Sequence, residues 1–483
     1  MRIIPRMNLP AATYDNDGYY RALSARDARF DGRFFTGVTS TGIYCRPVCR
    51  VRTPRQSNCR FFTLAAQAEA AGFRPCMRCR PELAPSVVHA TSTAPWSLQD
   101  ASAILARQAA QLLDSPQTWV DQGASLAMLA QRMGISARHL RRIFQAQWGV
   151  SPLQYLQTTR LLAAKNWLTD TRLSVPQVAA LSGFSSTRRF NAVFAERYRM
   201  PPLALRKAGL NPHTVATDHA PLPCYVLKAA YRPPYDVGAM LGFFATRATE
   251  GVETIDMASQ TLTRTLALNI AGRQYSGWAQ VKFLPTRCEL ELRISASLAE
   301  VLPQVLAALK DMLDLNADPQ AINQVLSPHF PGAEGTRVPG TADGFELAVR
   351  AILGQQITVR AARTLATRLV HRFGAPVQTP FAELTRLFPS ASTLAQAQGD
   401  ELGLLGIVRQ RQQAIIALAQ AVDRGAIELR PGADVPATMT ALQALPGIGA
   451  WTAHYIAMRA LRWPAKYWRN CSALAIKTGC TSE

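Results

Sequence analysis

The stretch "TGIYCRPVCRVRTPRQSNCRFFTLAAQAEAAGFRPCMRCRPE" (residues 41–82) decides how the first part of this 483-residue chain folds. It holds five of the nine cysteines, and four of these form two close pairs: Cys45 and Cys49 with three residues between them, and Cys76 and Cys79 with two residues between them. A segment of 26 residues separates the pairs. Two short thiolate pairs joined by a longer segment suit tetrahedral Zn²⁺. The spacing therefore predicts a zinc site with four cysteine ligands.

Two other interpretations of the four cysteines stay open. They could be buried thiols without a metal, which the polar and basic residues around them disfavour. They could also hold a zinc ion that only stabilises the fold. Cys59 is the odd cysteine of the segment, and we expect it to be a free thiol in the core.

The charge of the chain favours a polyanionic partner. The formal net charge is +21, and the excess is uneven: residues 1–90 contain 14 Arg against six acidic residues, and residues 125–210 contain 13 basic against two acidic residues. Basic side chains that neutralise phosphates gain affinity by releasing counterions. A surface that is basic only for solubility would mix signs and favour Lys, whereas residues 1–90 are basic through Arg alone.

Length and composition exclude several classes of protein. With 48% hydrophobic residues the chain can bury several cores, and about 150 residues per domain gives three or four domains. No apolar run is long enough to cross a bilayer, so no membrane partner is expected. The first twenty residues lack the apolar core and cleavage site of a signal peptide. We expect a cytoplasmic protein with mostly reduced thiols.

Changes in composition predict four domains. Residues 1–87 are rich in Arg and Cys and end in a linker-like stretch of Pro, Ser, Thr and Ala. Residues 97–208 repeat apolar side chains with the helical period, which predicts an all-α domain. Residues 223–337 mix β-rich runs with a helical run and predict an α+β domain. Residues 338–483 are helical again. The expected fold class is multidomain α+β, with a small zinc-bound α/β domain at the start and an incomplete all-α domain at the end.

The cysteine segment resembles the N-terminal domain of the Ada family of alkylation-response proteins over nearly its full length. The resemblance implies that Cys45 is both a zinc ligand and the acceptor of a methyl group from a DNA methylphosphotriester. Zn²⁺ with four thiolates has a net charge of −2, so electron density remains on sulfur for attack on carbon. Methylation reduces this negative charge from −2 to −1 and weakens repulsion from DNA phosphates. Each chain would react once and act as an irreversible sensor.

Residues 97–208 contain a repeated helix pair, with copies about 50 residues apart. The first copy turns at Gly134-Ile135-Ser136 and the second at Gly183-Phe184-Ser185, so Ser136 and either Ser185 or Ser186 are expected to cap the next helix. The helices after the turns carry side chains expected to contact DNA in the major groove: Arg138, His139, Arg141 and Arg142, and then Ser186, Arg188, Arg189 and Asn191.

Two such pairs in tandem resemble the AraC-type DNA-binding domain. The resemblance depends mainly on packing and turn positions: Leu140, Phe144, Gly149, Ser151, Pro152, Gly183, Phe184, Phe190 and Phe194. It implies promoter DNA as a partner, and RNA polymerase as a second partner.

The second half of the chain contains three motifs in order: "YRPPYDVGAMLGFFATRATEGVETID" (231–256), "DGFELAVRAILGQQITVRAARTLATRL" (343–369) and "LPGIGAWTAHYIAMRAL" (445–461). Together they resemble the AlkA family of alkylated-base DNA glycosylases, whose helical domain bears a helix-hairpin-helix. In the last motif Gly447 and Gly449 permit a tight turn, and N–H groups at the start of the next helix can hold a phosphate. An ordinary turn between two helices is the alternative.

The resemblance also assigns a base pocket. Trp451 and Tyr455 share one helix face because they are four residues apart, and electron-rich rings can stack on a positively charged alkylated purine. Gln356 matches the position that wedges into DNA where the base leaves. Core packing is the alternative for the aromatic pair.

Base excision in this family also needs an Asp about twenty residues after the hairpin, to stabilise positive charge on the sugar and direct water. From Val435 to Ser482 the sequence has no Asp or Glu, and the resemblance ends near Pro464. A frameshift, a truncation or a sequence error would each explain this end. We therefore expect little or no glycosylase activity. A "PCHR" motif is also absent, so direct reversal of O6-methylguanine is not predicted.

The main prediction is a DNA-alkylation repair and response protein. Cys45 is its single-turnover methyl acceptor, and the helix-turn-helix domain then activates transcription. The alternative is a DNA-3-methyladenine glycosylase II. A DNA-binding protein with a purely structural zinc is the third possibility.

Overall fold

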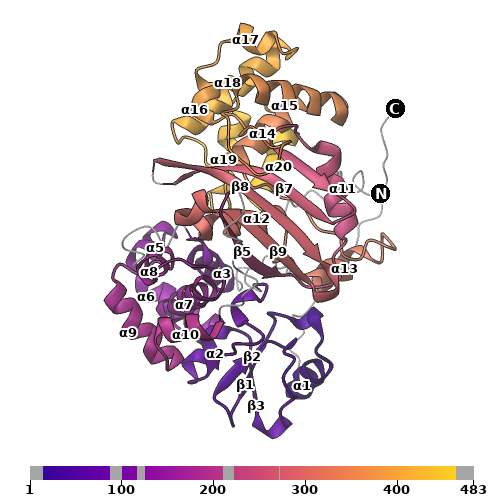
Figure 1. The fold of residues 1–483 in the computed structure, drawn as a ribbon. Coiled ribbons are helices and arrows are strands. Elements are labelled where there is room, and N and C mark those ends of the chain that lie inside the picture. The colour runs from indigo at the N-terminus through magenta and orange to yellow at the C-terminus, as the bar shows by residue number, and fades with distance from the viewer. Residues whose placement is uncertain (1–14, 87–100, 117–125, 210–221, 271, 464–483) are drawn as a thin grey trace. The chain divides into compact units, whose positions relative to one another are not determined.

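The structure is a computed structural model, and it describes residues 15–86, 101–116, 126–209, 222–270 and 272–463 (Figure 1). Contacts between residues divide the chain into two compact units. The N-terminal unit comprises Met1–Thr214, Ala229–Tyr235 and Leu315–Gly335, and the C-terminal unit comprises Val215–Lys228, Asp236–Asp314 and Thr336–Glu483.

A four-stranded sheet opens the N-terminal unit, with strand order β3-β1-β2-β4. Strand β1 pairs antiparallel with β2 and β3, whereas β4 runs parallel to β2. The elements of this part are α1 (Asn16–Ala25), η1 (Ala28–Phe30), β1 (Phe35–Val38), β2 (Ile43–Cys45), η2 (Gln56–Asn58), β3 (Cys59–Phe62), α2 (Ala65–Ala70), β4 (Arg74–Pro75) and η3 (Pro81–Leu83).

The parallel pairing of β2 and β4 positions the cysteines. Tyr44 lies opposite Pro75 in the register, and the N–H of Cys76 donates to the carbonyl of Tyr44 at 3.0 Å. Cys45 at the end of β2 and Cys76 directly after β4 therefore emerge at the same end of the sheet.

The rest of the N-terminal unit is mainly helical in the part that the structure describes. Its helices are α3 (Ala101–Asp114), α5 (Leu126–Arg132), α6 (Ala137–Trp148), α7 (Pro152–Asp170), α8 (Val175–Leu181), α9 (Thr187–Tyr198), α10 (Pro202–Gly209) and α13 (Pro319–Leu326). Serine hydroxyls accept the capping hydrogen bonds of four successive helices, α6 to α9. Ser186, not Ser185, caps α9. The turns before α6 and α9 use Gly134 and Gly183 with φ of +68° and +77°, which non-glycine residues seldom adopt.

The C-terminal unit contains a five-stranded sheet with strand order β5-β9-β8-β7-β6. Strands β6 to β9 are antiparallel neighbours, and β7 and β8 form a long hairpin in which Ile270 lies opposite Arg273. The elements around this sheet are β5 (Cys224–Ala230), α11 (Val237–Arg247), β6 (Glu253–Asp256), β7 (Thr261–Ile270), β8 (Arg273–Leu284), η6 (Pro285–Arg287), β9 (Glu289–Ser295), η7 (Ala296–Val301) and α12 (Leu302–Met312).

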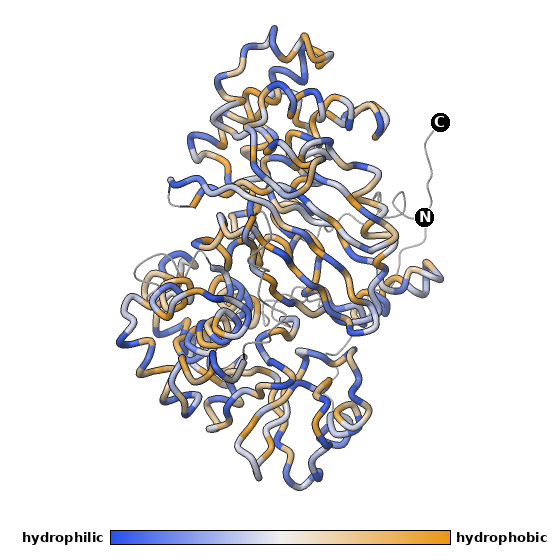
Figure 2. The backbone as a smooth tube through the Cα atoms, viewed as in Figure 1, coloured by the Kyte–Doolittle hydropathy of each residue, from blue (hydrophilic) through white to orange (hydrophobic). Residues whose placement is uncertain are grey.

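A helical bundle completes the C-terminal unit. Its helices are α14 (Gly344–Leu353), α15 (Val359–Phe373), α16 (Ala391–Ala395), α17 (Gly399–Gly403), α18 (Arg409–Asp423), α19 (Val435–Gln443) and α20 (Ala450–Ala460). Hydrophobic and hydrophilic residues alternate along most of these helices (Figure 2), and α14, α18 and α20 bury Ile352, Ile415 and Ile456 in one core. The multidomain α+β expectation is thereby confirmed. Within the described ranges, no helix combines the length and the hydropathy needed to cross a membrane.

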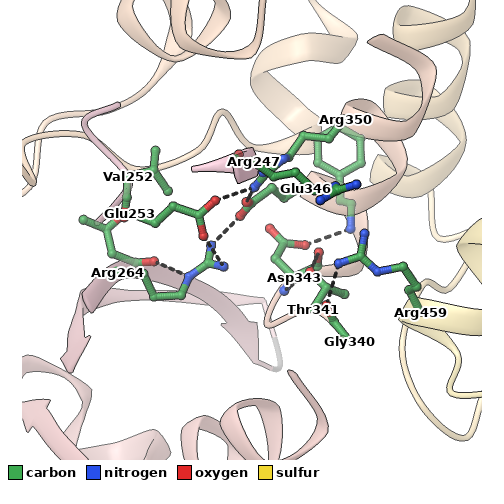
Figure 3. Close-up of polar contacts among 12 residues, drawn as sticks. Arg247, Val252, Glu253, Arg264, Gly340, Thr341, Asp343, Glu346, Arg350 and Arg459 are labelled. Carbon is green, nitrogen blue, oxygen red and sulfur yellow. Dashed lines mark hydrogen bonds and ion pairs between the residues drawn. The ribbon is translucent and has the colours of Figure 1, made fainter. Parts of the chain in front are cut away.

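Buried ion pairs join the sheet of the C-terminal unit to this bundle (Figure 3). Arg264 on β7 donates to Glu346 on α14 at 2.5 Å. Arg350 on α14 donates to Glu253 on β6 and to Glu346, both at 2.8 Å. The two guanidinium groups balance the two carboxylates, so the charge is compensated where water is excluded.

Removing one member of this cluster should destabilise the C-terminal unit. Arg264 is 4% exposed, and Arg264→Met would leave two buried carboxylates with one arginine. We expect a loss of about 3 kcal/mol, measured as the opening free energy from hydrogen exchange of the α14 amides. Arg273→Met on β8 is the control, because Arg273 pairs with Glu300 at 67% exposure and exposed pairs contribute less than about 1 kcal/mol. Equal losses in the two variants would contradict this account.

Candidate metal centre and DNA-binding elements

The four predicted cysteine ligands come together in the N-terminal unit. The Sγ atoms of Cys45, Cys49, Cys76 and Cys79 all lie within 4.8 Å of one another. Cys45, Cys49 and Cys76 are buried, and Cys79 is partly exposed. Cys59 lies outside this group on β3, partly buried, with its thiol donating to the carbonyl of Arg55 at 3.4 Å. It is a free thiol as expected, but it lies at the edge of the core.

The chemistry of the four sulfur atoms fits Zn²⁺. Hydrogen bonds with Cys49 and Cys76 raise the pKa of Cys45, and burial raises the pKa of Cys79, whereas hydrogen bonding from Cys45 lowers the pKa of Cys76. Thiols this close oppose ionisation of the whole set, so four thiolates require a compensating cation. Four sulfur donors in a compact group are the ligand set of structural and reactive zinc sites.

Arg46 supports the cysteine centre from one side. Its backbone N–H donates to Cys79 Sγ at 3.3 Å, and its Nη1 donates to the carbonyl of Cys79 at 2.9 Å. The same guanidinium forms a buried ion pair with Asp31. The backbone N–H thus contacts one ligand sulfur, and the side chain holds the backbone of Cys79 in place, as supporting residues around metal ligands do.

The predicted DNA-contacting residues lie on α6 and α9. On α6, Arg138, Arg141 and Arg142 are exposed, and His139 is half-buried. The opposite face of α6 is buried through Leu140, Ile143 and Phe144. At the N-cap and in the first turns of α9 the structure exposes all four predicted residues: Ser186, Arg188, Arg189 and Asn191. The Ser186 hydroxyl accepts from the Arg189 N–H at 3.4 Å, so this side chain already serves the helix cap.

The hairpin motif of the C-terminal unit forms the expected turn. Helix α19 ends at Gln443 and α20 begins at Ala450. Gly447 has φ of +73°, and a Cβ atom there would meet Ala414 at 3.3 Å. Gly449 is the N-cap of α20 and has open space around it. Because Gly449 has no side chain, it does not cover the backbone N–H groups at the start of α20.

A second loop is tied to this hairpin. The Gln355 side chain donates to the carbonyl of Gly447 at 2.9 Å and to Thr452 Oγ1 at 3.1 Å. The backbone carbonyl of Gln355 accepts from Arg411 on α18. The neighbouring Gln356 is exposed and has φ of +55°. The hydrogen bonds of Gln355 thus hold the candidate wedge residue beside the hairpin.

The aromatic pair on α20 presents an exposed ring. Trp451 is 62% exposed, and its ring stacks on that of Tyr455 with centroids 5.5 Å apart and an interplanar angle of 12°. Tyr455 packs against the bundle core and accepts a hydrogen bond from Arg459, whose guanidinium also lies over the Phe243 ring. Core packing therefore accounts for Tyr455 but not for Trp451.

Four family models match the chain. The metal-binding domain of Ada covers residues 18–82, and a helix-turn-helix domain covers 129–208. The AlkA N-terminal domain covers residues 226–343, and the HhH-GPD superfamily of base excision DNA repair proteins covers 349–463. These matches confirm the three resemblances, and together with the four-cysteine cluster they confirm zinc as the expected cofactor.

A Mycobacterium tuberculosis protein described as a probable bifunctional transcriptional activator/DNA repair enzyme AlkA is 34% identical over 458 residues, which are 93% of this chain and 87% of that protein. The chain belongs to this family. Its second half is also 38% identical to DNA-3-methyladenine glycosylase 2 of Escherichia coli, over 49% of the chain and 80% of that protein. The bifunctional activator and repair enzyme AdaA of Bacillus subtilis is 28% identical over 40% of the chain and 82% of that protein.

Family membership does not by itself identify the polar residues that support the cysteine centre. Sequence reasoning missed Arg46 and Asp31, and it missed the buried carboxylates Glu69 and Glu82. Lys165 is one of only two lysines among the first 210 residues, but the other, Lys207, is exposed, so residue type does not identify the buried one. The partner of Lys165, Glu82, lies 83 residues away in the sequence.

Zinc content tests the ligand set. Each chain should hold one zinc ion after gel filtration, and Cys76→Ser should lower the bound zinc well below one per chain because a four-thiolate site loses a ligand. Cys59→Ser is the matched control and should keep the full content. Zinc content is measured by inductively coupled plasma mass spectrometry. Equal zinc in both variants would refute the assignment.

Proposed function

We propose that this protein senses DNA alkylation by accepting a methyl group on Cys45, and that the methylated form activates transcription. The observation that carries the proposal is the convergence of Cys45 with three further cysteines in a compact buried group. The match to the Ada metal-binding domain and the 34% identical activator and repair enzyme support it.

The chemistry is a direct displacement. Zinc, when bound, keeps the Cys45 sulfur as a thiolate at neutral pH. The sulfur attacks the methyl carbon of a DNA methylphosphotriester, so that an S–C bond forms while the C–O bond to phosphate breaks. The phosphodiester anion leaves, and Cys45 becomes a thioether. No group on the chain removes the methyl again in this scheme, so each molecule reacts once.

The same reaction changes the charge of the centre. Four thiolates on Zn²⁺ carry −2, and conversion of one to a thioether leaves −1. At 4 Å in water one unit of charge against one phosphate is worth about 1 kcal/mol, which is roughly a fivefold change in affinity. DNA bound near the centre is therefore held more tightly after methylation.

Helices α6 and α9 supply the promoter-binding surface in this proposal. Their exposed Arg and Asn side chains suit base edges and phosphates in the major groove. Recruitment of RNA polymerase by the bound protein completes the activation step.

The position of the methyl group tests this function. Because trypsin does not cleave before proline, Cys45 and Cys49 share the peptide from Phe34 to Arg50. After exposure to methylated DNA this peptide should gain the mass of one methyl group, and fragmentation should place it on Cys45. Unmethylated DNA is the control. A methyl group on Cys49, or none on any of the four cysteines, would refute the proposal and leave a structural zinc.

Recognition of alkylated bases is the second candidate function. The exposed Trp451 ring, stacked on Tyr455 beside the hairpin, carries it, and the match to the base excision superfamily supports it. The predicted catalytic acid belongs near residue 471, and the segment 464–483 lies outside the described residues. The sequence from Val435 to Ser482 supplies no carboxylate. We therefore infer base binding with little or no excision.

Binding and excision can be measured separately. Release of free 3-methyladenine from methylated DNA should stay near the uncatalysed background. Trp451→Ala should weaken binding to a duplex with an alkylated purine by about 1–3 kcal/mol, the usual loss for one base–aromatic stack. Met257→Ala is the control, because Met257 is another exposed apolar residue of the C-terminal unit, with 48% of its surface exposed. Rapid base release would contradict the inference about the missing acid.

A further inference from the structure

Inside the N-terminal unit, a buried polar interface joins residues 15–86, which we call the cysteine domain, to the helices of the helix-turn-helix domain. Three anionic and three cationic side chains form it, and we call them the interface cluster: Glu69, Glu82, Asp170, Arg80, Lys165 and Arg197. The opposite charges balance, which is the condition under which charges remain stable away from water.

One half of the interface cluster surrounds Lys165 on α7. Lys165 is 1% exposed, and its Nζ lies 2.6 and 2.7 Å from the two carboxylate oxygens of Glu82. Arg80 donates to Glu82 at 2.9 Å and pairs with both oxygens of Asp170 at 2.7 and 2.8 Å. The Arg80 guanidinium also reaches the side chains of Asn166 and Thr169. Five hydrogen bonds thus connect Arg80 with α7 and η3.

The other half surrounds Glu69 on α2. One Glu69 carboxylate oxygen accepts from the Tyr44 hydroxyl at 3.0 Å, and the other accepts from Thr158 on α7 at 2.9 Å. Arg197 on α9 lies 3.5 Å from the same carboxylate and donates to the Glu69 carbonyl at 2.8 Å. The Glu69 side chain is fully buried. A single carboxylate therefore connects three elements: strand β2, helix α7, and helix α9, which follows the second glycine turn and carries predicted DNA-contacting residues.

Both halves begin next to a cysteine of the centre. Tyr44 directly precedes Cys45, and Arg80 directly follows Cys79. The path from Cys45 runs through Tyr44 and Glu69 to α9, and the path from Cys79 runs through Arg80 to the C-terminal turn of α7. A short polar chain thus links Cys45 to α9, which carries predicted DNA-contacting residues, and a second one links Cys79 to α7.

Directional contacts of this kind fix an orientation more narrowly than apolar packing does. Leu64 and Ala66 of the cysteine domain also pack in the core of the first helix pair, but apolar contacts tolerate small shifts. A buried ion pair loses its compensation when its partners separate, so one arrangement is strongly preferred.

We propose that the interface cluster is a positioning device, which holds the Cys45 centre at one place relative to α9 so that its change of charge on methylation becomes a gain in promoter affinity. This proposal rests on the proposed function. The interaction between the centre and a phosphate falls with distance and is screened by salt within about 10 Å. A centre that shifts relative to α9 would meet the DNA at variable distances, and the gain would be averaged away.

The test compares the ratio of promoter affinities with and without methylation. The variant is Lys165→Met in the full chain, which leaves the buried Glu82 with Arg80 alone. Lys207→Met is the matched control, because it removes the same charge from an exposed position on α10. The DNA probe is a duplex selected from a random pool with the methylated parent protein, and affinity is measured by fluorescence anisotropy.

We expect a gain of about fivefold on methylation in the parent and in Lys207→Met. In Lys165→Met the gain should fall below about twofold, while methyl transfer to Cys45 continues at the parental rate. The double variant Glu82→Gln with Lys165→Met removes both charges, so it should recover part of the gain. A merely structural role would lower folding stability without changing this ratio.

A milder variant guards against misfolding. Thr158→Val deletes one hydroxyl that donates to Glu69 and keeps the shape of the side chain, and it should lower the gain while zinc content remains complete. A parental gain that persists in Lys165→Met and Thr158→Val would overturn the positioning role. No gain in the parent would instead refute the proposed charge switch, so the two failures are distinguishable.

Discussion

A charge inside a protein must be compensated, and this constraint determines how the parts of each unit fit together. In the N-terminal unit the carboxylates of Glu82 and Asp170 meet Arg80 and Lys165 where the cysteine domain contacts α7. In the C-terminal unit Arg264 and Arg350 meet Glu253 and Glu346 where the sheet contacts α14 (Figure 3). Neither group of ion pairs tolerates a shift that separates its partners, because an unpaired buried charge destabilises the folded state by several kcal/mol.

This constraint also separates two classes of arginine. Arg46, Arg80, Arg264 and Arg350 are committed to carboxylates inside the protein. Arg138, Arg141, Arg188 and Arg189 lie exposed on helices with buried opposite faces. Both classes count equally among the basic residues of the sequence, but only the exposed class is available to phosphates. A count of basic residues therefore overstates the DNA-binding surface, and it conceals the residues that hold the structure together.

The two units suit different responses to alkylation. The cysteine centre suits a reaction with the DNA backbone, where a thiolate takes a methyl group from a phosphotriester. The hairpin of the C-terminal unit, with Trp451 and Tyr455 on α20 and Gln356 beside it, suits recognition of a base displaced from the duplex. Backbone and base lesions arise from the same alkylating agents. A chain that combines both kinds of site is therefore chemically coherent.

The sequence by itself determined the local features. Cysteine spacing predicted the four-sulfur group, repeated glycine turns predicted the two helix pairs, and "LPGIG" predicted the hairpin, because each depends on residues close together in the chain. The tertiary structure alone decided which distant side chains meet. Lys165 pairs with Glu82, and Glu69 accepts from Thr158, across 83 and 89 residues of sequence. Such pairs leave no local pattern, since they form only when the parallel strands β2 and β4 and the buried helix α7 bring their segments together. The spacing between Trp451 and Tyr455 likewise did not determine that Trp451 is exposed. Spacing shows that two residues share a helix face, but only the tertiary structure shows whether other elements cover that face.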